Sequence, residues 1–256
     1  MIRVENVWHH YGVRPVLKNV SLHVGKGELL AVMGPNGMGK STLLALIGGL
    51  LSPLKGYVEI DGLRRRSSIE AEIAIRKKMV YLPAQAYLPP DVTGREYLLA
   101  IGRLYDVEEE RLMQQTDKLL AIFDLDKHAD SIIQSYSTGQ QKKVSVCSAL
   151  ITEAPVLILD EPFSGGLDSS ALLALSKIFK KLAERNDVTV VMAVPVPELV
   201  EPLAHKIAII ADGQILACDS AEGLRRQTGC TGSLLEVLEA LIHPKAQASI
   251  DDYLER

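Results

Sequence analysis

The sequence predicts an α/β fold with a mixed central sheet, an N-terminal lobe of antiparallel strands and an inserted α-helical lobe. Several short apolar runs have the length and composition of buried strands. These runs lie at residues 28–33, 156–160, 188–194 and 206–211. The segment 3–61 consists of short strand-like stretches separated by turn residues. From 91 to about 150 the pattern becomes helical, and because this block interrupts the alternation of strands and helices, we interpret it as an insertion.

Length and composition limit the classes of protein to consider. With 256 residues, 47% of them hydrophobic, the chain can bury the core of one large α/β domain with lobes. Its net charge of −4 disfavours a general nucleic-acid binder, so we expect no nucleic-acid partner. Three scattered cysteines fit a reducing cytosol. The N-terminus has no signal-peptide pattern, and no run approaches the roughly 18 apolar residues that a membrane span needs. We therefore expect a cytoplasmic chain that reaches a membrane only through partners.

Turn residues separate the strands expected early in the chain. These strands cover residues 3–9, 16–24, 57–61 and 79–82. Two basic runs, at residues 64–66 and 77–78, accompany them, and we interpret both as solvated faces rather than as contacts with lipid headgroups.

Capping residues mark the helices. Thr93 and Glu96 form a capping box, which predicts a helix to about Tyr105. A second helix is expected from the region 106–109 to about 123. Farther along, the sequence predicts an amphipathic helix at 169–185 with Asp168 as its N-cap, a hairpin turn at 212–213 into a strand at 214–217, a helix beginning at 219–222 and a last helix at 233–242. The charged end after Pro244 is expected to be loosely held.

The stretch from Gly34 to Thr42 reads Gly-Pro-Asn-Gly-Met-Gly-Lys-Ser-Thr and matches the phosphate-binding P-loop pattern. It follows a buried strand and precedes a run of good helix formers, so backbone N–H groups and a helix N-terminus can face a phosphate. We predict that Lys40 neutralises the β- and γ-phosphates and that Ser41 ligates Mg²⁺. This is a P-loop NTPase core, and the residues expected to contact nucleotide are Asn36, Gly37, Met38, Gly39, Lys40, Ser41 and Thr42.

Two carboxylates follow the apolar strand 156–160. Asp160 ends that strand and is placed to bind Mg²⁺, directly or through water. Glu161 comes next, where a carboxylate can orient or deprotonate the attacking water. Lys40 and Glu161 are therefore our first candidate catalytic residues.

A serine and glycine turn at Tyr136-Ser-Thr-Gly-Gln140 opens another helix and offers a second anion-binding terminus. With the P-loop and the Asp160-Glu161 pair, this turn makes the chain resemble the ATP-binding cassette (ABC) ATPases. The turn looks like the family's Leu-Ser-Gly-Gly-Gln signature, with Tyr for Leu and Thr for the first Gly. Gly139 lies 21 positions before Asp160, much as in that family.

The resemblance covers roughly residues 2–228 and implies further roles. Tyr11 matches the aromatic residue that stacks on adenine, and Val16 is also expected to contact the nucleotide. Gln85 matches the glutamine that senses Mg²⁺ and the attacking water, so it is both a catalytic and a metal candidate. Asp168 matches the key position of a loop that crosses to a partner's site. The helical block at 93–105 and the chain length look most like short export-type cassettes.

The resemblance also implies a head-to-tail dimer around ATP and Mg²⁺, in which Ser137, Gly139 and Gln140 serve the partner's nucleotide. Whether the second ATPase subunit is identical or different stays open. Separate transmembrane permease subunits would hold the dimer on the inner face of the cell membrane. We expect an ATPase domain over 1–242, with 1–90 and 151–228 as core and β lobe and 91–150 as helical lobe, and a C-terminal helix and tail over 229–256.

One position departs from the family. The family carries a switch histidine just after the strand that here is 188–194, and counting back from His205 places Pro195 there. Proline has no side-chain donor and no N–H. Because loss of one preorganised donor typically costs about 10²–10³ in rate, we expect ATP binding to be intact and hydrolysis to be weakened.

Two other classes of protein share parts of this pattern. A soluble ABC protein without a transporter, acting as an ATP-gated switch or assembly scaffold, fits the same motifs. A neighbouring gene for a membrane protein would favour transport, and its absence would favour the switch. A P-loop kinase or GTPase is disfavoured by the signature turn and by Glu161, and the chain has no Asn-Lys-x-Asp guanine-binding motif.

Overall fold

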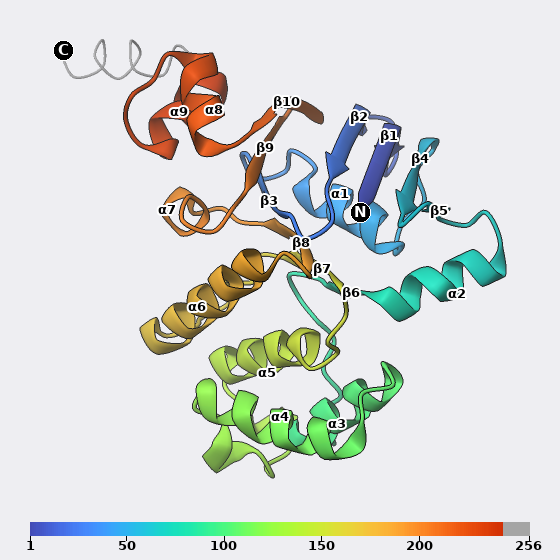
Figure 1. The fold of residues 1–256 in the computed structure, drawn as a ribbon, viewed down its shortest axis with the longest axis vertical. Coiled ribbons are helices and arrows are strands. Elements are labelled where there is room, and N and C mark those ends of the chain that lie inside the picture. The colour runs from blue at the N-terminus through green and yellow to red at the C-terminus, as the bar shows by residue number, and fades with distance from the viewer. Residues whose placement is uncertain (243–256) are drawn as a thin grey trace.

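The computed structural model describes residues 1–242, which form two β-sheets, a group of helices below the central sheet and a C-terminal helical region (Figure 1). The tail 243–256, for which the sequence predicts a loosely held end, lies outside the described residues.

The first sheet is antiparallel and forms the N-terminal β lobe. Its strand order is β2-β1-β4-β5. The strands are β1 (Ile2–His10), β2 (Pro15–Val24), β4 (Lys55–Ile60) and β5 (Leu63–Arg64). Ile2 and Val4 of β1 are fully buried on one face of the strand. Asn6 has a positive φ of 49° and the register with β2 shifts between Val4 and Val7, so the buried face continues at Val7 instead of at residue 6. The predicted antiparallel lobe is therefore confirmed.

The second sheet is the core of the molecule and has the order β10-β9-β3-β8-β7-β6. Its strands are β3 (Leu29–Met33), β6 (Met79–Leu82), β7 (Val156–Asp160), β8 (Thr189–Ala193), β9 (Lys206–Ala211) and β10 (Gln214–Asp219). β10 pairs antiparallel with β9, and the other pairs are parallel. The predicted mixed central sheet is confirmed. Because the five parallel strands end at one edge, the loops that follow them can meet there.

Helix α1 (Lys40–Gly48) lies between the two sheets (Figure 1). Leu43 and Leu44 are fully buried in a core that also contains Leu30 and Val32 of β3 and residues of the β lobe. Leu29 of β3 faces the opposite way, into a second core on the other face of the central sheet. β3 is therefore apolar throughout because both of its faces are covered.

Between β6 and β7 the chain forms α3 (Gly94–Leu104), α4 (Glu109–Ile122), two 3₁₀ turns at 126–128 and 133–135, and α5 (Thr138–Leu150). The capping box of Thr93 and Glu96 is present as predicted. The N-cap of α4 is Glu108, whose side chain accepts from the N–H groups of Glu110 and Arg111. Helix α5 is buried on nearly all sides, and it contacts α3, α4 and β6.

The rest of the chain adds α6 (Ser169–Arg185), α7 (Pro197–Val200), α8 (Ala221–Thr228) and α9 (Leu234–Ile242). Asp168 caps α6 as predicted, its Oδ1 accepting from Ala171 N–H at 2.8 Å. Helix α8 starts after its N-cap Ser220. None of the helices within residues 1–242 has both the length and the apolar character that crossing a membrane requires.

One sequence interpretation of the basic runs is wrong, at Arg65, and one helix between the two runs was not predicted. Lys77 and Lys78 are exposed, as predicted. Helix α2 (Ile69–Lys78) was not predicted, because Ile75 is its one buried residue and the apolar period is too weak to see. Arg65 does not lie on a solvated face. Its side chain is buried, donates to Ile47 O at 2.7 Å and pairs with Glu72 at 2.6 Å, so it packs α2 against the end of α1.

Candidate functional site

The P-loop connects β3 to α1 at the carboxyl edge of the central sheet. Gly39 has φ 101° and is the N-cap of α1. A Cβ at this position would lie 2.7 Å from Leu17 Cδ2 and 3.0 Å from Val16 O. Both the left-handed backbone and the close approach of β2 therefore require glycine here. The result is a helix N-terminus whose N–H groups are open to an anion.

Lys40 is folded over the loop that precedes it. Its Nζ donates to Gly34 O at 2.8 Å and to Pro35 O at 2.9 Å. Burial lowers the pKa of Lys40, and the nearby carboxylates of Glu161 and Asp160 partly offset that effect. The ammonium thus stabilises the curled loop and also lies next to the place where a phosphate would be held.

A hollow of about 470 Å³ opens in front of the loop. Its lining residues come from the β lobe, the P-loop, the first turn of α1 and the end of β7, and they are Tyr11, Val16, Asn36, Gly37, Gly39, Lys40, Ser41, Thr42 and Glu161. The structure thus brings together almost all the residues predicted to contact the chain's own nucleotide, whereas Ser137, Gly139, Gln140 and Asp168, predicted to serve a partner's nucleotide, lie outside the hollow. Met38 belongs to the same loop but does not line the hollow.

Tyr11 borders this hollow from the turn after β1. Its hydroxyl shares a 3.2 Å hydrogen bond with Thr42 Oγ1, and its ring stands edge-on to His9 at 5.0 Å between centroids. Tyr11 is 67% exposed and borders the hollow, so its ring is accessible to a flat ligand.

The two predicted carboxylates lie at the end of β7. Asp160 is only 2% exposed, and burial raises its pKa, an effect that Ser41, Lys142 and Lys40 partly offset. Within residues 1–242 its Oδ1 has no hydrogen-bond partner. A buried acceptor without a partner, close to the Ser41 hydroxyl, fits a hard cation that prefers oxygen ligands. No group of three or more acidic, His or Cys side chains in the described chain could hold a metal, so Mg²⁺ would complete its shell with phosphate oxygens and water.

Glu161 follows Asp160 with an uncommon backbone conformation. Its φ is 48°, in the left-handed region that non-glycine residues rarely adopt. Its N–H donates to Ala193 O at the end of β8, at 3.0 Å. This hydrogen bond holds the turn after β7 against the end of β8, and Glu161 borders the P-loop hollow there.

The signature turn lies at the start of α5. Ser137 and Gln140 form a reciprocal capping box, in which Ser137 Oγ accepts from Gln140 N–H and Gln140 Oε1 accepts from Ser137 N–H. Ser137 is exposed and Gly139 is half-buried. A Cβ on Gly139 would lie 2.6 Å from Gly166 O. None of these residues lines the chain's own P-loop hollow.

Gln85 also lies outside the P-loop hollow. It borders a separate hollow of about 320 Å³, together with Ala84, Thr138, Lys142 and Gly165. Its side chain is exposed. Its predicted contacts with Mg²⁺ and the attacking water therefore stay a prediction.

Pro195 comes two residues after Ala193, the last residue of β8, and is exposed. Because Ala193 O accepts from Glu161 N–H, Pro195 follows β8 at the same edge of the sheet as Glu161. His205 lies at the other end of the sheet, where its Nδ1 accepts from Leu29 N–H at 2.9 Å. It cannot take the place of a side chain at position 195.

Two buried lysines of α5 were missed by the sequence analysis. Lys143 Nζ lies 2.6 Å from Asp168 Oδ2, and Lys142 Nζ donates to Ala84 O at 3.4 Å. Both side chains are less than a tenth exposed. The sequence signal for their burial was their position directly before Val144, in a helix whose following residues are mostly small or apolar. A lysine buried in such a helix needs a partner for its charge.

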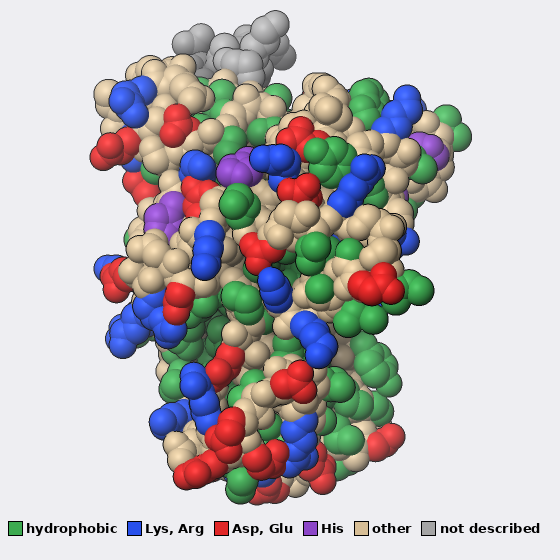
Figure 2. Space-filling view, turned by 45° about the vertical axis from the view of Figure 1, so that its right-hand side comes forward, with side chains coloured by type: hydrophobic (Ala, Val, Ile, Leu, Met, Phe, Trp, Pro, Cys, Tyr) green, Lys and Arg blue, Asp and Glu red, His purple; other side chains and the backbone are tan. Residues whose placement is uncertain are grey.

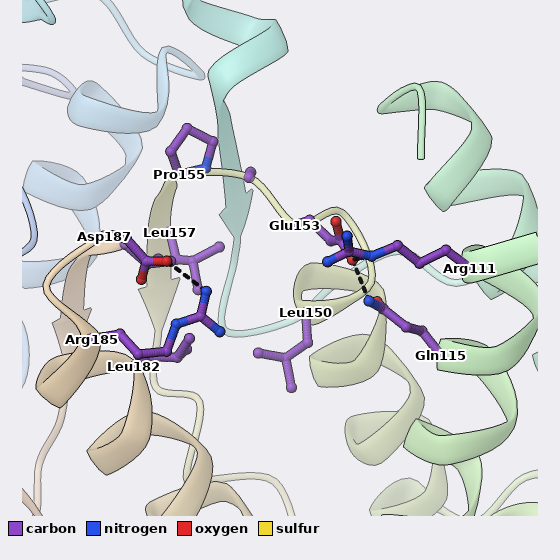
Figure 3. Close-up of a pocket in the computed structure, with 11 residues that line it drawn as sticks. Arg111, Gln115, Leu150, Glu153, Pro155, Leu157, Leu182, Arg185 and Asp187 are labelled. Atoms are coloured by element: carbon purple, nitrogen blue, oxygen red, sulfur yellow. Dashed lines mark hydrogen bonds and ion pairs between the residues drawn. The ribbon is translucent and has the colours of Figure 1, made fainter. Parts of the chain in front are cut away.

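Another hollow, of about 340 Å³, lies at the start of β7, the end of the strand that is opposite to Asp160 (Figure 3). Its charged side chains are paired with one another. On one side Arg111 donates to Glu153 at 2.7 Å, and on the other side Arg185 pairs with Asp187 at 2.5 Å, with leucine side chains between the two pairs. Because these ion pairs neutralise its charges, this hollow is not suited to a triphosphate.

Basic and acidic side chains are interspersed on the face seen in Figure 2, with no continuous basic field there.

The fold and the phosphate cradle define a P-loop nucleoside-triphosphatase. The ABC transporter family matches residues 17–164, more than half of the chain. A daunorubicin resistance ATP-binding protein of Streptomyces coeruleorubidus is 31% identical over 228 residues, which cover 89% of this chain and 71% of that protein. The chain therefore belongs to the ABC transporter family and is one of its ATP-binding, ATP-hydrolysing subunits.

Solved structures have the same fold. The ATP-binding subunit of an ABC transporter is 28% identical, with a TM-score of 0.86, and the match covers 94% of this chain and 99% of that one. An ATP-binding cassette solved as a dimer in a post-hydrolysis state, bound to ADP and Pi, is 27% identical with a TM-score of 0.77. That match covers 86% of this chain and 98% of that one.

Proposed function

We propose that this subunit powers a membrane transporter by closing with a second ATPase subunit, head to tail, around ATP. The observation that carries the proposal is the separation of two anion-binding helix ends. The end of α1 lies at the P-loop hollow. The end of α5, with Ser137 and Gly139, is accessible and lines no part of that hollow. One P-loop alone leaves γ-phosphate oxygens facing water, and a second helix N-terminus from a partner can cover them.

Each residue that lines the hollow has a role in holding ATP. Tyr11 stacks on adenine, with Val16 beside it, and the backbone N–H groups of residues 36–42 bind the phosphates. Lys40 exchanges its contacts with Gly34 O and Pro35 O for the β- and γ-phosphates. Gln140 supports Ser137 through the capping box, so the signature turn is already shaped for the partner's nucleotide.

The chain's own residues prepare the phosphoryl transfer. Ser41 and Asp160 would hold Mg²⁺, which when bound neutralises charge on the β- and γ-phosphates. Glu161 orients the attacking water and accepts its proton. Gln85 joins this group when its loop moves toward the hollow, and Asp168 faces the partner's site. Because Pro195 offers no donor at the same edge, we infer that hydrolysis is slower than a histidine at this position would allow, by about 10²–10³.

Separate permease subunits would hold the dimer at the cytoplasmic face of a membrane and choose the transported molecule. The drug-resistance role in the name of the Streptomyces relative supports an export direction. We propose one ATPase domain over 1–242, with 91–150 as its helical lobe; the end of the C-terminal region expected over 229–256 lies outside the described residues. The alternative, a soluble ATP-gated switch, predicts that no permease copurifies with the chain.

ATP-dependent dimerisation tests the central proposal. Glu161→Gln is expected to keep ATP bound, so the protein should sediment as a monomer without nucleotide and as a dimer with ATP and Mg²⁺. Adding Ser137→Asp should abolish the dimer. Aspartate is as good an N-cap as serine, so the helix stays capped while a negative charge meets the partner's γ-phosphate.

Ser68→Asp is the matched control, because Ser68 caps α2 in the same way, accepting from Ala71 N–H at 3.1 Å, and is exposed. It should leave the ATP-dependent dimer intact. A Ser137→Asp protein that dimerises as well as the control would contradict the proposal.

A further inference from the structure

Lys142 connects the loop that follows β6 and contains Gln85 (the Gln85 loop) to α5, the helix that begins with the signature turn (the signature helix). It lies in the second turn of α5, and its side chain is only 7% exposed. Within residues 1–242, the hydrogen bond found for its Nζ goes to Ala84 O, at 3.4 Å, the residue just before Gln85. Both residues border the same hollow of about 320 Å³. Movement of the Gln85 loop therefore changes the environment of the Lys142 ammonium.

The same side chain also contacts the loop that leads to Asp168. A Cβ on Gly165 would lie 3.2 Å from both Cγ and Cδ of Lys142, so the backbone of that loop rests on the lysine stem. One side chain of α5 thus touches the loops that follow two neighbouring strands, β6 and β7.

The charge of Lys142 acts on the carboxylates at the end of β7. Asp160 and Glu161 both oppose the effect of burial on the pKa of Lys142, as they do for Lys40. The two lysines come from opposite faces of the central sheet, since α1 packs in one core and α5 in the other. The carboxylates are therefore flanked by positive charge from both faces.

A purely structural role does not explain this lysine. A buried ammonium that forms no ion pair within 4 Å among the described residues costs stability, and an apolar residue of similar length would fill the same space at lower cost. Such charges in native proteins are typical of functional sites.

We propose that Lys142 is a positioning residue for ATP hydrolysis, which holds the Gln85 loop through Ala84 O and places its positive charge between that loop and the loop that follows Glu161. It acts at an edge of the sheet where Pro195 supplies no donor. This inference rests on the proposed function, because it concerns the rate of the same hydrolytic step. Lys142 contributes to the reaction through Glu161 and the Gln85 loop, and it does not line the P-loop hollow.

Lys142→Met tests the charge, because methionine keeps the stem that packs on Gly165. We expect kcat to fall about tenfold or more, with the KM for ATP unchanged within about twofold. Amide hydrogen exchange at residues 84–88 should become faster, since the tether at Ala84 is lost. Lys142→Arg keeps the charge and should have a kcat closer to that of the wild type than to that of Lys142→Met. Lys180→Met, at an exposed position of α6, is the control and should change none of these quantities.

A Lys142→Met protein with wild-type kcat would overturn the inference. Equal loss of kcat in the Met and Arg variants, with faster exchange throughout α5, would also overturn it, because the lysine would then act only in packing. Neither result touches the proposed function if the Glu161→Gln chain still forms the ATP-dependent dimer. Failure of Glu161→Gln to form that dimer would count against the proposed function instead.

Discussion

Lys143 Nζ lies 2.6 Å from Asp168 Oδ2, so a buried ammonium of the signature helix holds the carboxylate that caps α6. The pair joins the turn that we assign to the partner's nucleotide to the loop that follows the catalytic strand. Any movement of α5 on ATP binding is therefore transmitted to Asp168 through an ion pair as well as through packing.

A double-mutant cycle measures the strength of this ion pair. Lys143→Met, Asp168→Asn and the double variant should give a coupling of about 1 kcal/mol in the free energy of unfolding, because Asp168 is 56% exposed and solvent screens the pair. Chemical denaturation of the four proteins supplies the data. A coupling near zero would mean that the contact has no energetic role.

The same pair predicts a pH dependence. The hydrogen bond from Lys143 is the main cause that lowers the pKa of Asp168 below its ordinary value of 3.8. An acid with a lowered folded-state pKa stabilises the protein above its ordinary pKa and loses that contribution as the pH falls through the lowered one. The stability difference between wild type and Asp168→Asn should stay constant from about pH 5 to pH 8 and shrink below about pH 4. A difference that grows on acidification would contradict the assignment.

Pro195→His should restore a donor at the carboxyl edge of β8. We expect kcat to rise by about tenfold or more with little change in the KM for ATP, since one well-placed donor is worth about 10²–10³. Steady-state ATP turnover is the measurement. Val196→His places the same group one residue farther along and should not help. If both variants keep the wild-type rate, Pro195 is not what limits hydrolysis.

Asp160→Asn tests the metal site. Its buried Oδ1 has no partner among the described side chains and backbone groups, and an amide is a weaker ligand for Mg²⁺ than a carboxylate. ATP affinity measured in EDTA should be preserved, whereas the increase in affinity on adding Mg²⁺ should be lost. A full Mg²⁺ effect in the variant would place the ion elsewhere.

Two variants of Tyr11 separate the contribution of its ring to ATP affinity from that of its hydroxyl group. Tyr11→Phe removes the 3.2 Å contact with Thr42 Oγ1 but keeps the ring, so ATP affinity should change little. Tyr11→Ala should lose about 1–3 kcal/mol of ATP binding, the usual range for a base stacked on an aromatic side chain. Calorimetry with ATP gives both values, and tripolyphosphate, which has no adenine, is the control ligand. Equal loss for both ligands would mean that Tyr11 acts through the P-loop and not through the base.

The parts of the site that could be predicted are contiguous in sequence. The P-loop follows its strand directly, and Asp160-Glu161 ends an apolar run, so spacing alone predicts where these residues lie. The capping box at Thr93 was predictable for the same reason, because its hydrogen bonds span three residues. Because neighbouring residues form these features, they could be predicted without knowledge of the tertiary packing.

The parts that were missed depend on contacts between distant segments. Arg65 looks like one of three solvated arginines until α2 and the end of α1 enclose it. Lys142 and Lys143 become recognisable only when the loops at residues 84 and 165–168 pack against α5. Helix α2 buries too little apolar surface to leave a period in the sequence. In each case tertiary packing decides what the residue or helix does, and the local sequence pattern does not predict it.

Complementation between two inactive variants tests the shared nucleotide site most directly. Lys40→Ala removes the P-loop ammonium, and Ser137→Asp blocks the signature turn, so each protein alone should hydrolyse almost no ATP. In a head-to-tail dimer of the two, one site joins the intact Lys40 of one chain to the intact Ser137 of the other. Mixing the proteins should therefore restore a substantial fraction of wild-type turnover. A mixture that stays as inactive as its components would show that Ser137 does not serve a partner's ATP.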